Sequence, residues 1–368
     1  MPSASTVATS SNVTVPFVVN VVLITAFPPE LTRWISSLPL NEQLPFPQGN
    51  EPSGAPLRLN RSLGVLGITT GMGPMRAAAS IVALGHDLRW DLSASYFLVA
   101  GIAGVDPQFG SIGSAFVARH LVGIGGGYFL DGVGHIPQGR THVDFGPPLP
   151  TPADSRAQGV LHSLSSELSA WALGLASTAS LPDTPSLQAA RARFTAPSEA
   201  PARLPPAVRA GDSVTGETFG AGFEWTAWAR NATAYWGGGR ASFASTQMED
   251  LAFATALGSL TRDGRANVSR LVVLRAVSDY SYPPPGQVSI REWFFNDPLH
   301  MCNDEAFYAL LAAGMPIVRG MIARATSDAA SSPPNALTPS RGGAGCAPSA
   351  GPLAQTRAAA AALDVSGQ

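Results

Sequence analysis

Short apolar runs of strand length alternate along the chain with segments whose apolar residues recur at helical spacing. Several of these runs end in Gly-rich turns that lead into a helix. Repeated strand–turn–helix units are typical of a mainly parallel sheet with helices on both faces, and therefore of an α/β fold. The pattern predicts strands at 16–25, 63–68, 95–99, 114–122 and 270–277. It predicts helices over 76–84, 161–173 and 304–325. Two further helices are predicted to begin at 26–30 and after residue 248.

The two ends of the chain lack this pattern. Residues 1–14 are small and polar, and 326–368 are mostly Ala, Ser, Pro and Gly, so we predict that both are disordered. The folded domain is therefore expected at 15–325. Within it, 123–160 are rich in Gly and Pro and are predicted to be irregular, and 176–208 fit no regular element and are a candidate insertion.

Composition narrows the chemistry. Charged residues make up 13% of the chain, and all 23 basic residues are arginine, which excludes Schiff-base chemistry and a P-loop lysine. No basic run suggests a nucleic-acid partner. The two cysteines, Cys302 and Cys346, and the six histidines have no metal-ligand spacing, so neither a metal site nor a disulfide framework is predicted.

The apolar run at 15–29 is the segment to test as a signal or membrane sequence. No positive charge precedes it, and it is too short to span a bilayer. Its β-branched residues suit a first core strand. We therefore predict a soluble, cytoplasmic protein with no membrane partner.

Two acidic positions are the main candidates for chemistry. The strand at 270–277 is followed by Ser278 and Asp279, and then by prolines that extend neither strand nor helix. Placing a carboxylate at the end of a buried strand is costly, which favours a functional role for Asp279. Shortly before this strand, Met248 and Glu249 begin an apolar helix, and we predict that Glu249 and Asp279 face one pocket. A helix N-terminal acid and a turn residue are the structural alternatives.

Several segments together resemble one family: Phe-Pro-Pro-Glu at 27–30, Thr-Thr-Gly at 69–71, the Gly-rich 96–107, Met-Glu-Asp at 248–250, and 278–287 with its Ser-Asp-Tyr and proline run. They resemble the fungal and bacterial purine nucleoside permease family, which has no membrane spans despite its name. More remotely, the chain resembles the nucleoside phosphorylase and nucleosidase superfamily. That resemblance implies a single α/β domain with a central mixed, mostly parallel sheet flanked by helices, assembled as a homo-oligomer.

The resemblance also implies roles for individual residues. Met248 would pack on the ribose of a purine nucleoside, and Glu249 would accept hydrogen bonds from its 2′ and 3′ hydroxyls. Ser278 would contact the substrate. Asp279, the next residue, would protonate N7 of the purine, and Phe219 would stack on the base. Protonation makes the base a better leaving group and contributes roughly 10²–10⁴ in rate. Core packing is the alternative for Phe219.

The same resemblance bears on the attacking group. In phosphorylases the loop that matches Gly101, Ile102 and Ala103 supplies a hydroxyl to phosphate, which neither Ile102 nor Ala103 can do. In nucleosidases a glutamate beyond the first strand activates water. Glu30 lies at that spacing, although a first-turn helix acid is equally expected there. We therefore favour hydrolysis. Phosphate is a second candidate ligand, because Thr69, Thr70 and Arg76 could build a phosphate site and Arg275 is another possible ligand for it.

Three alternatives stay open on the sequence. The first is phosphorolysis of a purine nucleoside, and the second is nucleoside binding without chemistry, linked to uptake. The third is a recruited biosynthetic enzyme that uses the same pocket for a non-nucleoside metabolite. None of these predictions requires a metal or an organic cofactor.

Overall fold

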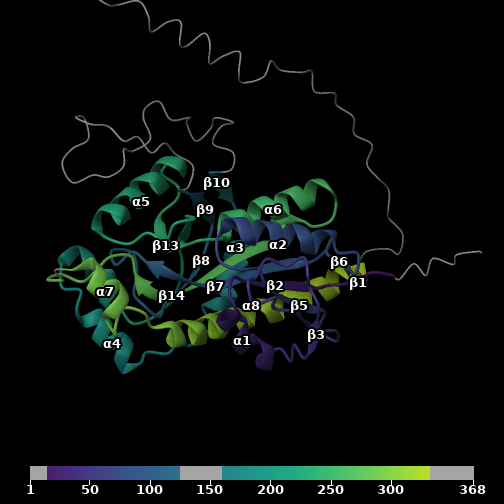
Figure 1. Ribbon diagram of the computed structural model, residues 1–368, viewed down its shortest axis with the longest axis horizontal. Coiled ribbons are helices and arrows are strands. Elements are labelled where there is room, and N and C mark those ends of the chain that lie inside the picture. Colours follow the sequence, from purple (N-terminus) through teal and green to yellow (C-terminus); the bar gives the residue numbers. More distant parts are fainter. Residues whose placement is uncertain (1–14, 125–159, 288, 332–368) are drawn as a thin grey trace, which may run out of the picture. The chain divides into compact units, whose positions relative to one another are not determined.

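The computed structural model describes residues 15–124, 160–287 and 289–331. By its internal contacts the chain divides into two units, Met1–Ala329 and Ala330–Gln368, and the second lies almost wholly outside the described residues. The predictions for 1–14, for nearly all of 123–160 and for most of 326–368 likewise fall outside the described residues. The fold described below is that of the first unit (Figure 1).

The central element is a mixed twelve-stranded sheet. Its main path runs β10 (Leu161–Ser163), β9 (His120–Gly123), β12 (Asp212–Thr215), β13 (Phe243–Gln247), β7 (Tyr96–Val105), β2 (Val21–Thr25), β5 (Val65–Thr69), β4 (Leu57–Asn60) and β3 (Glu42–Leu44). Off this path, β14 (Leu271–Tyr280) pairs with β7 and β8 (Ala115–Val117), and β11 (Val208–Ala210) pairs with β8. A separate parallel pair joins β1 (Phe17–Val18) to β6 (Trp90–Asp91). The strands at the centre, β2, β5, β7 and β14, are mutually parallel. Antiparallel pairs join β3 to β4, β4 to β5, β8 to β14, β9 to β10 and β7 to β13. The predicted α/β fold with a mixed, mostly parallel sheet is confirmed.

Helices cover both faces of this sheet. They are α1 (Pro28–Ser37), α2 (Pro74–His86), α3 (Ser166–Ala176), α4 (Pro185–Ala192), α5 (Phe223–Trp236), α6 (Asp250–Arg262), α7 (Ile290–Asn296) and α8 (Asn303–Ser331). Alternate residues of one strand enter opposite cores: Val22 packs with α2 and α6, while Val21 packs with α1, α3 and α8. Burial on both faces explains why the central strands are continuous apolar runs. Figure 1 shows α2 and α6 on one side of the sheet and α8 on the other.

The two strands β7 and β14 are longer than the sequence suggests. We predicted that Gly101–Gly104 form a turn and that the strand at 270–277 ends before Ser278. In the structure these segments continue the strands, with Arg275 opposite Gly101 and Asp279 opposite Gly104, and a register shift between Val277 and Asp279. The polar residues therefore lie inside the sheet rather than in loops beyond it.

Other predicted elements differ in extent. The helix predicted at 161–173 is strand β10 followed by α3, and the strand predicted at 114–122 is divided into β8 and β9. The candidate insertion at 176–208 contains α4 and a 3-10 helix at Pro197–Arg203, both packed against the main body through Leu187 and Ala202. Strand β13 and helix α7 were not predicted at all.

Helix α8 continues to Ser331, beyond the predicted boundary at residue 325. Its stretch Asn303–Asp328 contains an 18-residue window with a mean hydropathy of 1.6, which is long and apolar enough to cross a membrane, yet half of that window is buried in the protein. The buried side chains, among them Leu310, Ile317 and Val318, pack with the sheet in one core. Core packing therefore accounts for the apolar character of α8, and the cellular location stays a prediction.

Candidate active site

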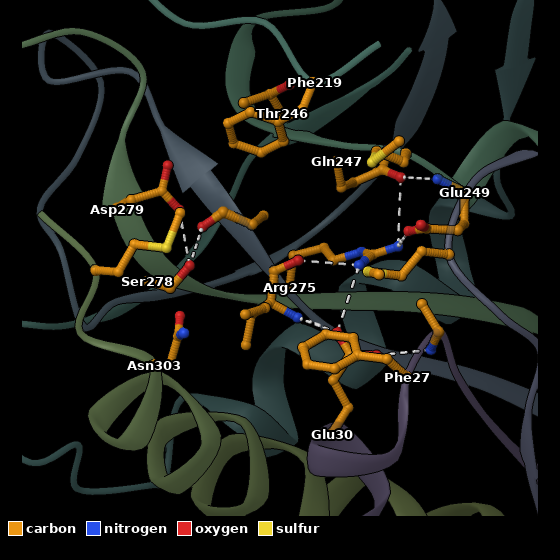
Figure 2. Close-up of a pocket in the computed structure, with 16 residues that line it drawn as sticks. Phe27, Glu30, Phe219, Thr246, Gln247, Glu249, Arg275, Ser278, Asp279 and Asn303 are labelled. Atoms are coloured by element: carbon orange, nitrogen blue, oxygen red, sulfur yellow. Dashed lines mark hydrogen bonds and ion pairs between the residues drawn. The ribbon is translucent and has the colours of Figure 1, made fainter. Parts of the chain in front are cut away.

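A cavity of about 260 Å³ opens where β7, β13 and β14 meet the N-terminal ends of α1, α6 and α8 (Figure 2). Its walls combine three carboxyl groups, one guanidinium, several small polar groups and a larger apolar surface. The lining residues are Ala26, Phe27, Glu30, Met72, Ile102, Ala103, Phe219, Thr246, Gln247, Met248, Glu249, Arg275, Ser278, Asp279, Met301 and Asn303. The small volume and mixed walls suit a single small organic ligand.

Arg275, in the middle of β14, organises one side of the cavity. It is 2% exposed, and its Nε and Nη2 donate to Asp250 Oδ1 at 3.0 and 2.5 Å. Nη2 also donates to Glu249 Oε2 at 3.2 Å, and Nη1 donates to the Ile102 carbonyl at 3.0 Å. Burial alone lowers the pKa of Arg275, but the charges of Asp250, Glu249 and Glu30 outweigh burial and raise that pKa above its usual value. Arg275 is therefore a fixed cation that is already hydrogen-bonded to protein acceptors.

Glu30 lies on α1, whose Pro-Pro start and extended Phe27 place an acidic residue in the first helical turn. Its Oε2 accepts from the Ala26 N–H at 2.6 Å, its Oε1 accepts from the Ile102 N–H at 2.7 Å, and Arg275 Nη1 lies 4.0 Å from Oε1. Burial raises the pKa of Glu30 to about 7, with the Arg275 charge opposing that rise. The contacts favour the charged form, so Glu30 is arranged to accept a proton near neutral pH.

Asp279 lies on β14 and has a different environment. Its Oδ1 accepts from the Ser278 hydroxyl at 2.8 Å, while Oδ2 has no hydrogen-bond partner among the described residues. Burial raises the pKa of Asp279 to about 7, and the Ser278 hydroxyl opposes the rise. A Cβ on Gly104 would lie 2.8 Å from Oδ2, so glycine at this position leaves room for the carboxyl group. Among the described residues the group that opposes the rise at Asp279 is a neutral hydroxyl, whereas at Glu30 it is the charge of Arg275.

Glu249 precedes α6 and is held by its neighbours. Gln247 Oε1 accepts from the backbone N–H groups of Glu249 and Asp250 at 2.5 and 2.8 Å, which fixes the turn from β13 into α6. The carboxylate of Glu249 accepts from the Gly73 N–H at 2.9 Å in addition to its bond from Arg275. With two donors already present, it keeps lone pairs that can accept from the hydroxyls of a ligand.

Apolar groups close the remaining walls. Phe219 is half-buried and packs against Phe294 of α7, with 5.7 Å between the ring centroids. Figure 2 draws Phe219 beside Thr246, above Asp279, and Phe27 below Arg275 near Glu30. The cavity thus has an aromatic wall near Asp279 and another near Glu30.

Most residues predicted for the site line this cavity: Glu30, Phe219, Met248, Glu249, Ile102, Ala103, Ser278 and Asp279. Gly101 lies behind the wall, where an added Cβ would be 2.3 Å from Arg275 Nη1 and 2.8 Å from Glu30 Oε1. Thr70 does not line the cavity, and its buried hydroxyl donates to the carbonyls of Thr25 and Gly71. The structure therefore gives no support to a ligand role for Thr70.

Sequence reasoning missed several lining residues, including Gln247 and Asn303. It considered Arg275 only as an anion ligand, although a lone charge inside an apolar strand is a sign that acidic partners are near. For Asn303 the sequence gives no comparable sign. Among the described residues there is no group of three His, Cys, Asp or Glu side chains that could hold a metal ion.

The fold and the site define an α/β protein with a buried pocket of carboxyl groups. A family described as purine nucleoside permease matches residues 18–329, and the chain belongs to that family. A purine nucleoside permease of Candida albicans is 28% identical over 316 residues, which cover 82% of this chain and 74% of the relative. A probable purine nucleoside permease of Schizosaccharomyces pombe is 29% identical over 261 residues, covering 68% and 74%. The family resemblance predicted from the motifs is confirmed.

Solved structures similar to this chain include 5′-methylthioadenosine/S-adenosylhomocysteine nucleosidases. The enzyme of Neisseria meningitidis has a TM-score of 0.47 and 15% identity, over 84% of this chain and 99% of that one. The enzyme of Helicobacter pylori has a TM-score of 0.48 and 14% identity, over 83% and 97%. These likenesses are too distant to bear on the reaction or on the residues of the site.

Proposed function

We propose that this protein cleaves the N-ribosyl bond of a purine nucleoside by hydrolysis. The observation that carries the proposal is that one cavity presents two carboxyl groups, Glu30 and Asp279, whose pKa values are both raised to about 7 in unlike surroundings. Two acids with similar pKa values and opposite local preferences suit general base and general acid roles. The family description supplies the substrate class, a purine nucleoside.

In this proposal Asp279 is the acid. Its Oδ2, which has no partner among the described residues, carries the proton and donates it to N7 of the purine as the bond from C1′ to N9 breaks. The electrons of that bond pass into the base, which leaves neutral because it has gained the proton. The sugar carbon develops oxocarbenium character, which the negative charges of Glu249 and Glu30 stabilise.

Glu30 is the base. Two backbone N–H groups and Arg275 favour its carboxylate form, so it can take a proton from a water molecule as the water oxygen bonds to C1′. The products are free purine and ribose. Met248 and Glu249 are proposed to hold the sugar, and Phe219 is proposed to stack on the base.

Electrostatics favour water over phosphate as the attacking group. Among the described lining residues Arg275 is the sole cation, and it already donates to Asp250, Glu249 and Ile102. Three carboxyl groups line the same small cavity, so a phosphate dianion would meet like charges without an available counter-charge. Arg76, an earlier candidate for a phosphate site, is exposed and does not line the cavity.

The test is incubation of the protein with adenosine, inosine and guanosine, with and without phosphate. Free purine and ribose in phosphate-free buffer support hydrolysis. Release that requires phosphate and yields ribose 1-phosphate would reassign the protein to phosphorolysis. Base release should fall in Asp279→Asn. The matched control for that variant is Asp304→Asn, since Asp304 is 84% exposed and does not line the cavity.

A second candidate is binding without chemistry, which the permease names of the relatives favour. Calorimetry separates the two proposals. Nucleoside binding that persists in Asp279→Asn, together with no base release by the unaltered protein, would favour binding alone.

Assembly and location are further proposals. We expect a homo-oligomer, which sedimentation velocity would measure directly. We also expect the protein in the soluble cytoplasmic fraction, and its recovery with membranes after cell fractionation would contradict that expectation.

A further inference from the structure

Asp250 is a buried acid to which the proposed mechanism gives no role. It is the first residue of α6, is fully buried, and does not line the cavity. Its Oδ1 accepts from Nε and Nη2 of Arg275 at 3.0 and 2.5 Å. Burial lowers the pKa of Arg275, and among the charges that oppose burial that of Asp250 has the largest effect. Asp250 is therefore the main counter-charge of Arg275.

A chain of hydrogen bonds makes Asp250 an acceptor at both of its oxygens. Gln247 Oε1 accepts from two backbone N–H groups at the start of α6, so Nε2 is the group that donates to the Ser213 hydroxyl oxygen, at 3.0 Å. The Ser213 hydroxyl has one hydrogen, which it donates to Asp250 Oδ2 at 2.7 Å. Because Oδ1 accepts from Arg275, neither oxygen of Asp250 has room for a proton of its own. These contacts suit the carboxylate form of Asp250.

Asp250 also determines which way the guanidinium of Arg275 faces. It binds the Nε and Nη2 edge, which leaves Nη1 to donate to the Ile102 carbonyl at 3.0 Å and to lie 4.0 Å from Glu30 Oε1. The Ile102 N–H donates to the same Glu30 oxygen at 2.7 Å. Figure 2 draws Arg275 between Glu249 and Glu30. A carboxylate outside the cavity thus holds the cation in place beside the proposed base.

The protonation of Glu30 depends on how far the charge of Arg275 is compensated. The charged groups on the elements around Glu30 are Arg33 of α1, Glu249 and Asp250 at the start of α6, Arg275 and Asp279 of β14, and Asp304 of α8. Burial raises the pKa of Glu30, Arg275 opposes that rise, and Glu249 adds to it. Arg33 pairs with the exposed Asp304. Removal of the charge of Asp250 would leave Arg275 less compensated, and the ionised form of Glu30 would then be favoured.

We propose that Asp250 is a positioning residue that orients Arg275 and partly neutralises its charge, so that Glu30 stays basic enough to take a proton from water. The proposal rests on the proposed role of Glu30 in hydrolysis. Without Asp250 the carboxylate of Glu30 would face a cation with weaker compensation and would be a weaker base. Asp250 itself touches neither substrate nor water in this proposal, and it acts only through Arg275.

The experiment measures the protonation of Glu30 directly in the full chain. Carbon-13 NMR follows the side-chain carboxyl carbons of glutamate during a pH titration, and Glu30→Gln identifies the signal of Glu30. The unaltered protein should give a midpoint at about pH 7. In Asp250→Asn the midpoint should fall by roughly one pH unit, and the acidic limb of the pH profile of base release should move to lower pH with it. Asp250→Ala is the second neutral variant and should shift both in the same direction.

Two controls separate charge from packing. Ser213→Ala removes the hydrogen bond to Asp250 Oδ2 but keeps the charge, so the protein should lose stability in urea while the midpoint of Glu30 stays in place. Asp263→Asn removes an equal charge at the other end of α6, where Asp263 is exposed, and it should leave the midpoint unchanged.

An unchanged midpoint in both neutral variants, even with lower stability, would mean a merely structural role and overturns the proposal. A midpoint at about 4.3 in the unaltered protein, the ordinary value of a glutamate, overturns it without any variant. The proposed function fails separately: if the unaltered protein releases no base from any nucleoside while the midpoint still shifts, the effect of Asp250 on Glu30 stands and the proposed reaction does not.

Discussion

Replacement of Asp279 by asparagine is expected to stabilise the protein at alkaline pH. Burial raises the pKa of Asp279 from 3.8 to about 7, so between these values the folded state holds a proton that the unfolded chain has lost. Stability then falls as pH rises, because unfolding releases that proton. At about 1.4 kcal/mol per pKa unit, the cost to the folded protein is about 2 kcal/mol at pH 5 and about 4 kcal/mol at pH 8. Asparagine has no charge to bury and escapes this cost.

Urea unfolding at pH 5 and pH 8 measures the effect. The free energy of unfolding of Asp279→Asn, relative to the unaltered protein, should increase by about 2–3 kcal/mol between the two pH values. Base release should fall by roughly 10²-fold or more, because the amide cannot supply the proton. Asp304→Asn makes the same substitution at a side chain that is 84% exposed, and it should show no such increase.

Parallel pH dependences for Asp279→Asn and the unaltered protein would refute the reasoning. That result would mean that Asp279 is ionised in the folded protein at pH 5, and it could not then act as a neutral acid. If Asp279→Asn is more stable at alkaline pH but still releases base, then Asp279 is buried as a neutral acid but does not take part in the reaction.

Three further changes test the rest of the site. Glu30→Gln should lower kcat by roughly 10²–10⁴ and abolish the limb of the pH–rate profile that rises toward pH 7, because that limb reports loss of the proton from Glu30. Arg275→Met should destabilise the fold by about 3–5 kcal/mol in urea unfolding, since Asp250 and Glu249 keep buried charges without a partner. Gly101→Ala should abolish base release, because its Cβ would lie 2.3 Å from Arg275 Nη1, while Gly258→Ala, with nothing within 4 Å, should keep activity in the same assay.

Much of the fold could be predicted because apolar periodicity reports burial. Strands β2, β5 and β14 are buried at every position, and their apolar runs can be recognised in the sequence without knowing which strands pair with them. The lengths of β7 and β14 could not be predicted. Gly101 and Gly104 are typical of turns, and Ser278 and Asp279 are typical of strand ends. Pairing between the two strands overrides these local preferences.

For the candidate site as well, some features could be predicted from the sequence and others could not. The motifs predicted that Glu249 and Asp279 face one pocket, and both residues line the cavity, while their chemical roles stay predictions. The contacts of Arg275 could not be predicted, because they depend on α6 and β14 lying side by side in three dimensions.

The spacing of Arg275 and Asp279 along β14 gives the two acids, Glu30 and Asp279, different surroundings. Four residues of extended strand span about 13 Å, so the fixed charge of Arg275 lies far along the cavity from Asp279. Arg275 opposes the pKa rise at Glu30, 4.0 Å away, whereas at Asp279 the opposing group is the Ser278 hydroxyl. A single strand thus carries both the cation that favours the ionised form of Glu30 and an acid, Asp279, whose raised pKa no cation opposes among the described residues. A second cation beside Asp279 would ionise it, and a site built that way could no longer protonate a leaving base.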